Sequence, residues 1–332
     1  MNAARTHDPL GRLVLGVGGG PLVAVERVAG GGNNRAVRVE AMHGRYFAKN
    51  YFRDGVDPRD RMGAETAFLR HCAAHSIAGV PRLLATDDDA ALALFGWIDG
   101  RAASQTPVSG ADVDAALAFF ARLNAERVDP RALELPAASE ASFSLAEHFS
   151  AVERRVATLE GAAEVDPELA DFVSGQLRPL WSAIRARVEG DAVRGWSDPL
   201  SARQRCLSPS DFGFHNALRT ADGSLLFHDF EYAGWDDPAK TVADFFFQPR
   251  SGVGGDEYGR FADRVIEILG LDPSERRRID VLRPLMGLRW CCIHAGQRVA
   301  DAARRRRYAG AERRAAEGLD RARALAASLR GM

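Results

Sequence analysis

The sequence changes character at Asp99-Gly100, and this change limits the possible folds more than any other feature. Before it, short segments of alternating apolar and polar residues are typical of strands, whereas beyond it long stretches show helical spacing. A chain of 332 residues is also longer than one typical domain. We therefore expect an α+β protein with two lobes that share a cleft, one formed by residues 1–99 and the other by residues 100–332.

The first lobe is predicted to contain a small antiparallel sheet and one main helix. Turns rich in glycine and asparagine join its first three strands, and these residues tolerate a positive φ. Asp57 and Pro58 provide an N-cap and a first helical residue, so a helix is expected from Pro58 to about His75. The expected strands cover residues 22–28, 36–41, 45–52, 81–85 and 91–98.

The second lobe is predicted to be mostly helical. One stretch interrupts the helices: between Gln204 and Phe230 the apolar runs are short, and Asp222-Gly223 marks a hairpin turn. The expected helices cover residues 110–126, 144–160 and 167–189, and continue from 258 to the C-terminus with breaks near 273 and 309.

The densest chemical signal lies around this hairpin. Asp211 and Asn216 form the pattern D-x4-N before it, and Asp229-Phe230-Glu231 follows it. Phosphoryl transfer needs a positioned acceptor hydroxyl and positive charge near the phosphate oxygens. Asp211 is suited to orient and deprotonate the hydroxyl, while Asn216 and Asp229 offer the oxygen ligands that Mg2+ prefers. D-x4-N alone is common by chance, but its combination with D-F-E is much more specific.

These two segments resemble the catalytic and metal-binding loops of the aminoglycoside phosphotransferase and choline kinase family, which is distantly related to protein kinases. The resemblance covers nearly the whole chain. It implies a bilobal protein-kinase-like fold with a small antiparallel β-rich N-lobe, one main helix in that lobe, and a larger, mostly helical C-lobe. It also implies Asp211 as the catalytic base, Asn216 and Asp229 as the metal ligands, and ATP or GTP with Mg2+ as the phosphoryl donor.

One position departs from the family pattern. The family usually has a structural His two residues before the catalytic Asp, and this chain has Pro209 there. The change removes no reactive group, but it leaves the hydrogen bonding of the loop to other residues, such as Ser208 or Ser210.

The first lobe independently offers a lysine and a glutamate for the triphosphate. Strand alternation places Lys49 on the same face as Phe47 and Tyr51, where an unpaired ammonium group would be costly to bury. On the following helix, Glu65 interrupts an apolar stripe. An ion pair between Lys49 and Glu65 explains both features, and an edge-strand lysine with an ordinary surface glutamate is the alternative.

Other nucleotide-binding candidates are Gly31, Gly32, Asn33, Asn34, Trp97 and Ile98. The first four form the turn ahead of the lysine strand, and their backbone amides are expected to cover the triphosphate; an ordinary hairpin is the alternative. The last two close the final strand of the lobe and are expected to line the adenine pocket, although core packing explains the tryptophan nearly as well. The earlier cluster from Gly16 to Gly20 lacks the flanking elements of a dinucleotide-binding turn and is expected to be a flexible connection.

The segment after D-F-E argues against a polypeptide substrate. Only residues 231–236 separate Phe230 from Asp237-Pro238, which leaves no long activation segment to hold a peptide. We expect a small-molecule acceptor, and the resemblance suggests sugars, amino alcohols, aminoglycosides or other hydroxylated metabolites. Two alternatives remain: a catalytically weak nucleotide-binding or interaction protein, and a reduced protein kinase. Glu231 is open between a metal contact and a structural cap.

The composition argues against nucleic acid or a membrane as partner. The chain has 44 Lys and Arg against 45 Asp and Glu, so no overall field attracts a polyanion or a membrane surface. Its four cysteines lack the spacing of a metal site or a disulfide framework. No apolar stretch approaches the roughly 20 residues of a membrane span, and no signal peptide is evident. We expect a cytoplasmic protein whose partners are a nucleoside triphosphate and a small molecule.

Overall fold

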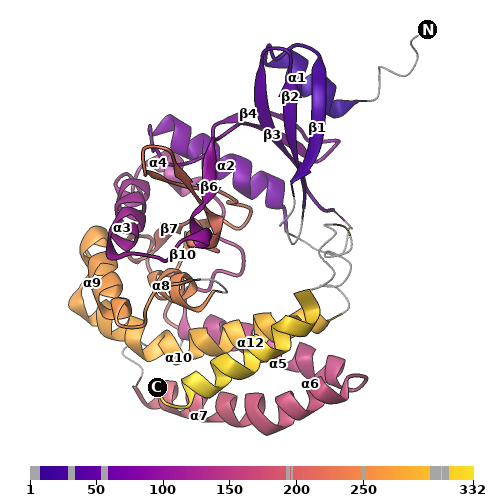
Figure 1. Ribbon diagram of the computed structural model, residues 1–332. Coiled ribbons are helices and arrows are strands. Elements are labelled where there is room, and N and C mark those ends of the chain that lie inside the picture. The colour runs from indigo at the N-terminus through magenta and orange to yellow at the C-terminus, as the bar shows by residue number, and fades with distance from the viewer. Residues whose placement is uncertain are drawn as a thin grey trace.

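A five-stranded antiparallel sheet with the strand order β1-β2-β3-β5-β4 forms the centre of the smaller lobe (Figure 1). The computed structural model describes residues 8–28, 34–53, 59–191, 195, 197–248, 251–299, 308 and 314–332. Each of the five predicted strands is present, with ends that shift by no more than two residues. The elements of this lobe are α1 (Pro9–Gly16), β1 (Leu22–Val28), β2 (Arg35–Ala41), β3 (Gly44–Asn50), α2 (Arg61–Ala74), β4 (Leu83–Asp87) and β5 (Leu92–Gly96).

The main helix of this lobe, α2, begins at Arg61 rather than at the predicted Pro58. Arg59 and Asp60 are not helical, and the carboxylate of Asp60 accepts a hydrogen bond at 2.9 Å from the backbone N–H of Gly63. Asp60 is thus the N-cap, because it satisfies one of the backbone donors that the first helical turn leaves unpaired. The predicted N-cap, Asp57, lies outside the described residues, as does Pro58.

A short helix that the sequence did not predict, α1, precedes the sheet and buries Val14 against its outer face. The glycines after α1 are ordered, since the N–H of Gly19 donates to the carbonyl of Val14 at 2.9 Å. A Cβ at Gly19 would lie 2.7 Å from the hydroxyl oxygen of Tyr46, so this close approach requires glycine. The expectation of a flexible connection at Gly16 to Gly20 is therefore wrong. The order helix, glycines, strand is also the reverse of a dinucleotide-binding turn.

The larger lobe is mostly helical, as predicted, and it carries two small sheets, β6-β8-β9 and β7-β10. Its strands are β6 (Gly100–Ala102), β7 (Cys206–Ser208), β8 (Ala217–Thr220), β9 (Leu225–Phe227) and β10 (Gly234–Asp236). Its α-helices are α3 (Gly110–Asn124), α4 (Pro130–Leu133), α5 (Leu145–Ala163), α6 (Pro167–Phe172), α7 (Arg178–Asp191), α8 (Pro238–Phe247), α9 (Glu257–Leu269), α10 (Pro273–Ala295) and α12 (Arg314–Leu329). Shorter helical turns are η1 (Ala103–Gln105), η2 (Val173–Leu177), η3 (Ala202–Gln204), η4 (Phe214–Asn216) and η5 (Gly296–Arg298).

Two features of this lobe differ from the sequence expectation. The single helix expected at 167–189 is divided into α6 and α7 by the π-helical turn η2. The helix α8 is not among the helices expected from the sequence; Asp237 is its N-cap and Pro238 its first residue. The break expected near 309 lies outside the described residues. The division of the chain into two lobes between residues 99 and 100 stays a prediction.

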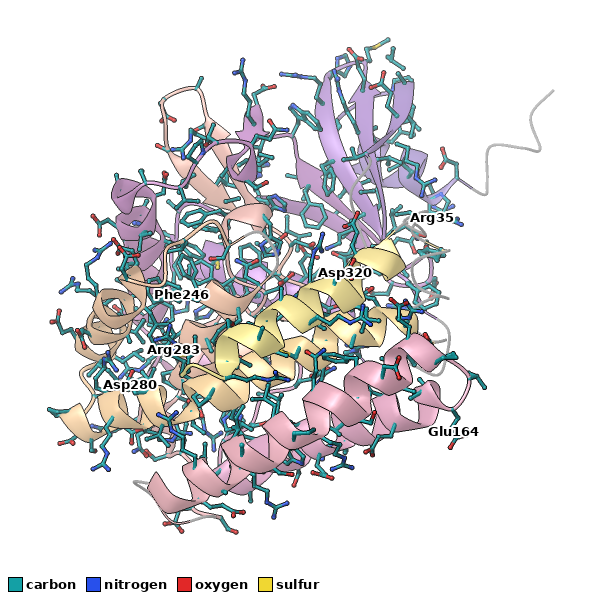
Figure 2. All side chains as sticks on the ribbon, turned by 60° about the horizontal axis from the view of Figure 1, so that its bottom comes forward. Arg35, Glu164, Phe246, Asp280, Arg283 and Asp320 are labelled. Atoms are coloured by element: carbon teal, nitrogen blue, oxygen red, sulfur yellow. The ribbon has the colours of Figure 1, made fainter. Side chains whose placement is uncertain are left out.

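The central helix of the larger lobe is α10, which packs against α5, α7, α8 and α12. Figure 1 and Figure 2 both show α12, in yellow, running alongside α10. Within the described part of the chain, no helix is both long enough and apolar enough to cross a membrane.

Buried phenylalanines connect α2 to the segments that carry the predicted site. The ring of Phe68 in α2 lies 4.6 Å from that of Phe230, and Phe119 in α3 lies 4.9 Å from Phe227. Phe212 packs on Phe227 at 5.1 Å. Burying each such ring stabilises the fold by about 1.5–3 kcal/mol. Because Phe212 and Phe230 directly follow the two predicted aspartates, this packing fixes both loops on one core.

Candidate active site

Lys49 lies on the middle strand β3, and its side chain reaches the second lobe at Asp229. Its partners on the two adjacent strands are Ala36 and Ala93, and their small side chains leave room for the lysine side chain. Its side chain is only 8% exposed, and its Nζ lies 2.7 Å from Glu65 Oε2. The ion pair expected between the strand lysine and the helix glutamate is therefore present.

Glu65 holds this lysine from the buried face of α2. The hydroxyl of Tyr51 donates to the same carboxylate oxygen at 2.6 Å, and the N–H of Phe230 donates to the other oxygen at 3.2 Å. Burial and the charge of Glu65 raise the pKa of Tyr51 well above its ordinary value, so Tyr51 stays a donor. Three elements of the chain thus meet at one carboxylate.

Asp229 belongs to the second lobe but contacts Lys49 directly. Its φ of 68° is left-handed, which is uncommon for a residue other than glycine. Burial alone would lower the pKa of Lys49, but the carboxylates of Asp229 and Glu65 raise it well above its ordinary value. Burial would in turn raise the pKa of Asp229, and the charge of Lys49 lowers it. Both side chains are therefore ionised.

Asp211 lies in the turn between β7 and η4, with its carboxylate partly exposed. The side-chain nitrogen of Asn216 donates to Asp211 Oδ2 and to its backbone oxygen, both at 3.1 Å. His215 Nε2 lies 3.2 Å from Oδ1. The sequence alone assigned His215 no contact with Asp211. Residues 214–216 form a 3-10 turn, which rotates successive side chains by about a third of a circle and brings His215 beside Asp211.

Asn216 and Asp229 are brought together by the hairpin that separates them in sequence. The N–H of His228 donates to the carbonyl of Asn216 at 2.9 Å, which joins the two loops. Since the amide nitrogen of Asn216 is bound to Asp211, its remaining polar atom is an oxygen, the ligand type that Mg2+ prefers. Among the described residues, no group of three or more His, Cys, Asp or Glu could hold a metal ion. Two protein oxygens suit Mg2+ that also binds phosphates and water.

Asn34, the last residue of the predicted glycine turn, is tied to the second lobe. Its amide nitrogen donates to Glu231, and its oxygen accepts from the N–H of Phe52 at 3.1 Å. Glu231 also lies 3.7 Å from the Nζ of Lys49. The structure thus places Glu231 against Asn34 and Lys49, two residues that the sequence predicts to bind the nucleotide. The other predicted turn residues, Gly31, Gly32 and Asn33, lie outside the described part of the chain.

Trp97 and Ile98 follow β5 and are half-buried. Phe95 is opposite Phe47 in the sheet, on the face that carries Lys49, and Trp97 is two residues further along. The ring of Trp97 lies 5.3 Å from the guanidinium of Arg38, and its Nε1 donates to Asp99 at 3.0 Å. Trp97 thus lies at the edge of the cleft face rather than in the core.

A β-sheet lobe with one main helix, placed over a helical lobe and joined to it by a lysine and two acidic residues, defines a protein-kinase-like fold. The sequence model of the Phosphotransferase enzyme family matches residues 24–282. This chain therefore belongs to the Phosphotransferase enzyme family. A comparison with curated proteins finds no match.

Solved structures with the same fold include kinases of small molecules. A complex of LicA with AMP has a TM-score of 0.60 at 15% identity, covering 93% of each chain. The choline kinase LicA from Streptococcus pneumoniae has a TM-score of 0.58 at 14% identity, covering 92% of this chain and 94% of that one. Spectinomycin phosphotransferase APH(9)-Ia, in complex with ADP and spectinomycin, has a TM-score of 0.58 at 10% identity with the same coverage. At these identities the likeness shows the fold alone.

Proposed function

We propose that this chain is a magnesium-dependent kinase that transfers the terminal phosphoryl group of ATP or GTP to a hydroxyl group of a small molecule. One observation carries the proposal. Lys49, held by Glu65, contacts Asp229 of the second lobe. The backbone of His228, the residue before Asp229, is hydrogen-bonded to Asn216, whose side chain in turn binds Asp211. A cation for phosphate, two metal ligands and a base therefore lie in one connected group.

Each of these residues has a defined task in the transfer. The ammonium of Lys49 would bind phosphate oxygens, exchanging its contact with Asp229 for the triphosphate. Asp211 would accept the hydroxyl proton as the acceptor oxygen bonds to the terminal phosphorus and the bond to the bridging oxygen breaks, leaving a nucleoside diphosphate. Mg2+ held by Asn216 and Asp229 would offset the negative charge of the triphosphate.

The nucleotide would lie between the glycine turn and the end of β5. Backbone amides of Gly31, Gly32 and Asn33 would cover the phosphates, and Asn34, engaged with Glu231, would fix the end of that turn. Trp97 and Ile98 would border the base. Structures of this fold in complex with AMP and with ADP support a nucleotide as ligand.

A small acceptor is favoured by the short segment after Asp229. After Phe230 the chain makes one turn, forms β10 and enters α8 at Pro238, so residues 231–237 offer no platform for an extended peptide. Structures with the same fold include a choline kinase and a spectinomycin phosphotransferase, which supports a hydroxylated metabolite such as an amino alcohol, a sugar or an aminoglycoside. We propose a cytoplasmic location from the cysteine pattern, since the four cysteines show no disulfide framework.

The test is incubation with radiolabelled ATP or GTP, Mg2+ and a library of hydroxylated metabolites, with a polypeptide mixture as control. We expect label in one class of small molecule and none in polypeptide. Label in polypeptide would indicate a reduced protein kinase instead. Nucleotide binding without transfer to any acceptor would indicate a non-catalytic interaction protein.

A further inference from the structure

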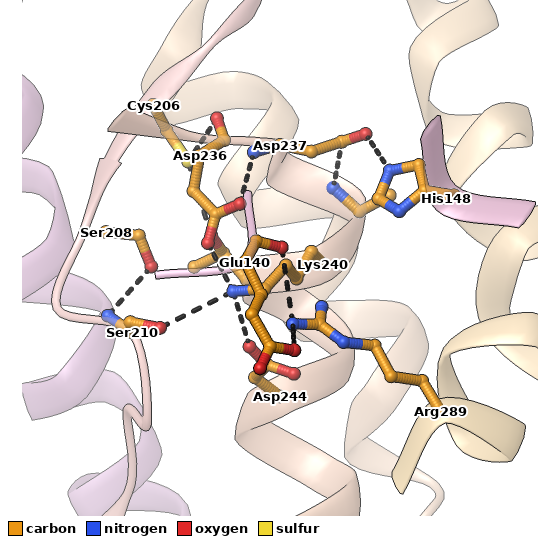
Figure 3. A network of polar contacts seen from close by, with 12 residues as sticks. Glu140, His148, Cys206, Ser208, Ser210, Asp236, Asp237, Lys240, Asp244 and Arg289 are labelled. Atoms are coloured by element: carbon orange, nitrogen blue, oxygen red, sulfur yellow. Dashed lines mark hydrogen bonds and ion pairs between the residues drawn. The ribbon is translucent and has the colours of Figure 1, made fainter. Parts of the chain in front are cut away.

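Lys240 lies beside Ser210, in a network of buried polar groups (Figure 3). Its side chain is 1% exposed and lies between the carboxylates of Asp236 and Asp244, the latter at 3.0 Å. Its Nζ also donates a long hydrogen bond of 3.4 Å to the hydroxyl of Ser210. Since Ser210 directly precedes Asp211, Lys240 contacts the loop that carries the proposed base.

Lysine is rare in this chain. Of its 44 lysines and arginines, only Lys49 and Lys240 are lysines. Lys49 is part of the proposed triphosphate site, and Lys240 touches the neighbouring loop. An ammonium group directs three donors from a single nitrogen, whereas a guanidinium group is a planar fork. The three acceptors around Lys240 belong to Asp236, Asp244 and Ser210. Because they converge on one point, the position requires lysine rather than arginine.

The loop that contacts Lys240 needs support because two consecutive residues have a left-handed backbone conformation. Ser210 has a φ of 48° and Asp211 a φ of 31°. Such a backbone persists only where its surroundings hold it firmly. Pro209 has no N–H to contribute. The N–H of Ser210 donates to Ser208 Oγ at 3.0 Å, and the Ser210 hydroxyl is held by Lys240. The backbone N–H and the side-chain hydroxyl of Ser210 are therefore both held by hydrogen bonds.

A second side chain supports the other side of Asp211. Gln248, the C-cap of α8, is 3% exposed, and its amide nitrogen donates to the carbonyl of Phe212 at 3.1 Å. The next residue is Gly213, where a Cβ would lie 1.3 Å from that nitrogen, so only glycine leaves room for the contact. Lys240 and Gln248, near opposite ends of α8, thus hold the two neighbours of Asp211.

The network is itself anchored to α10, since the indole N–H of Trp290 donates to Asp244 at 2.8 Å. Burial alone would lower the pKa of Lys240, but the charges of Asp236 and Asp244 raise it. Lys240 is therefore charged. It is held between the carboxylates of Asp236 and Asp244, and Trp290 connects Asp244 to the helical core.

We infer that Lys240 and Gln248 are positioning residues that fix the backbone on both sides of Asp211, and with it the direction of the Asp211 carboxylate. The inference rests on the proposed function in one respect, the role of Asp211 as the base. The support of the loop by α8 does not depend on that role.

The kinetic test compares Ser210→Ala, Lys240→Met and the double variant, using magnesium-dependent hydrolysis of ATP with water as acceptor. Ser210→Ala removes only the link to the loop and leaves both ion pairs of Lys240 intact, so it is the variant expected to fold normally. We expect kcat to fall about 10- to 100-fold in each single variant, with unchanged nucleotide affinity, because a small displacement of a catalytic group has effects of this size. The double variant should be no slower than Lys240→Met.

Lys240→Arg separates charge from geometry and should be about as slow as Lys240→Met. Full activity in Ser210→Ala, or effects that multiply in the double variant, would overturn the inference. The control is Val156→Ala, a truncation of a fully buried side chain in α5 that should lower the melting temperature and leave kcat unchanged.

Amide hydrogen exchange in the full chain gives a readout that is independent of catalysis. The segment 207–216 should exchange faster in Ser210→Ala and in Gln248→Met than in the wild type, and Val156→Ala should leave it unchanged. Unchanged exchange in both loop variants would refute the positioning role. A wild-type chain that transfers phosphate to no acceptor, with faster exchange in the variants, would refute the proposed function alone.

Discussion

Glu65 connects Lys49 to the backbone of the opposite lobe. One of its carboxylate oxygens lies 2.7 Å from Lys49 Nζ, and the other accepts the N–H of Phe230 at 3.2 Å. Because Phe230 follows Asp229, a single carboxylate sets the lysine relative to a proposed metal ligand. A lysine held in this way is a prepositioned charge rather than a flexible one.

Replacing the lysine should therefore slow transfer strongly. Lys49→Ala is expected to raise the barrier by on the order of 3 kcal/mol in kcat/KM for the nucleotide. Glu65→Gln should have a smaller effect in the same direction, because Asp229 and Glu231 still contact the lysine. Steady-state kinetics measure both, with Arg185→Ala on the exposed face of α7 as control. An unchanged rate in Lys49→Ala would contradict the assignment of the cleft.

Asp211→Asn should abolish most turnover while leaving nucleotide binding intact. The asparagine keeps the shape of the side chain but removes the basic group, and loss of a general base costs about 10²- to 10⁴-fold in kcat. Single-turnover kinetics together with nucleotide titration check the two halves of this prediction. Full activity in the variant would refute the role of Asp211 as the base.

Asp229→Asn should weaken the binding of the magnesium-bound nucleotide. Asparagine tolerates the left-handed φ of 68° at this position, so the backbone should persist while one metal ligand loses its charge. Calorimetric titration of ATP with and without Mg2+ measures the effect. We expect the variant to lose the gain in affinity that Mg2+ gives the wild type. An equal gain in both proteins would show that Asp229 does not bind the metal.

The Asp237→Ala variant should be less stable than the wild type, although the substitution changes no residue of the proposed active site. Asp237 is fully buried and accepts hydrogen bonds from Arg278 at 2.8 Å and from the N–H of Ala239 at 2.8 Å, while His148 Nε2 lies 2.8 Å from its other oxygen. Removing it leaves the buried guanidinium of Arg278 with the more distant carboxylate of Glu275, 3.9 Å away, which costs up to about 3–5 kcal/mol in the free energy of unfolding. Chemical denaturation measures this. The matched control, Asp114→Ala, removes an exposed partner of Arg260 and should cost about 1 kcal/mol or less.

The stability that Glu140 provides should depend on pH. Although burial opposes its ionisation, Arg155 and Arg289 lower the pKa of Glu140 from 4.5 to about 2. Its contribution is therefore complete above its unfolded pKa and is lost as the pH falls from about 4.5 toward 2. The difference in melting temperature between the wild type and Glu140→Gln should be constant from pH 7 to about 5 and shrink below that. A constant difference down to pH 3 would contradict the assignment.

Acidic side chains of α9 are engaged at the surface, since Glu257 pairs with Arg260 at 2.7 Å and Asp263 with Arg276 at 2.6 Å. They therefore give no sign of a site for a cationic acceptor. The metabolite library addresses this point directly.

The sequence by itself determined the elements whose signals are local. Alternation along β3 placed Lys49 on the cleft face, helical spacing placed Glu65 on the buried side of α2, and Asp222-Gly223 marked the hairpin, where Gly223 has a φ of 86°. These features follow from backbone geometry within a few residues, so a pattern in the chain is enough to predict them.

Only the tertiary structure decided which distant groups support the catalytic loop. Nothing near Ser210 or Phe212 in sequence indicates that α8 lies against them, with Lys240 donating to the hydroxyl of Ser210 and Gln248 donating to the carbonyl of Phe212. The fully buried Asp237, with its partners on α5 and α10, is hidden in the same way. Such contacts join residues about 30 to 90 positions apart, and they depend on how helices pack on the core, which no local period records.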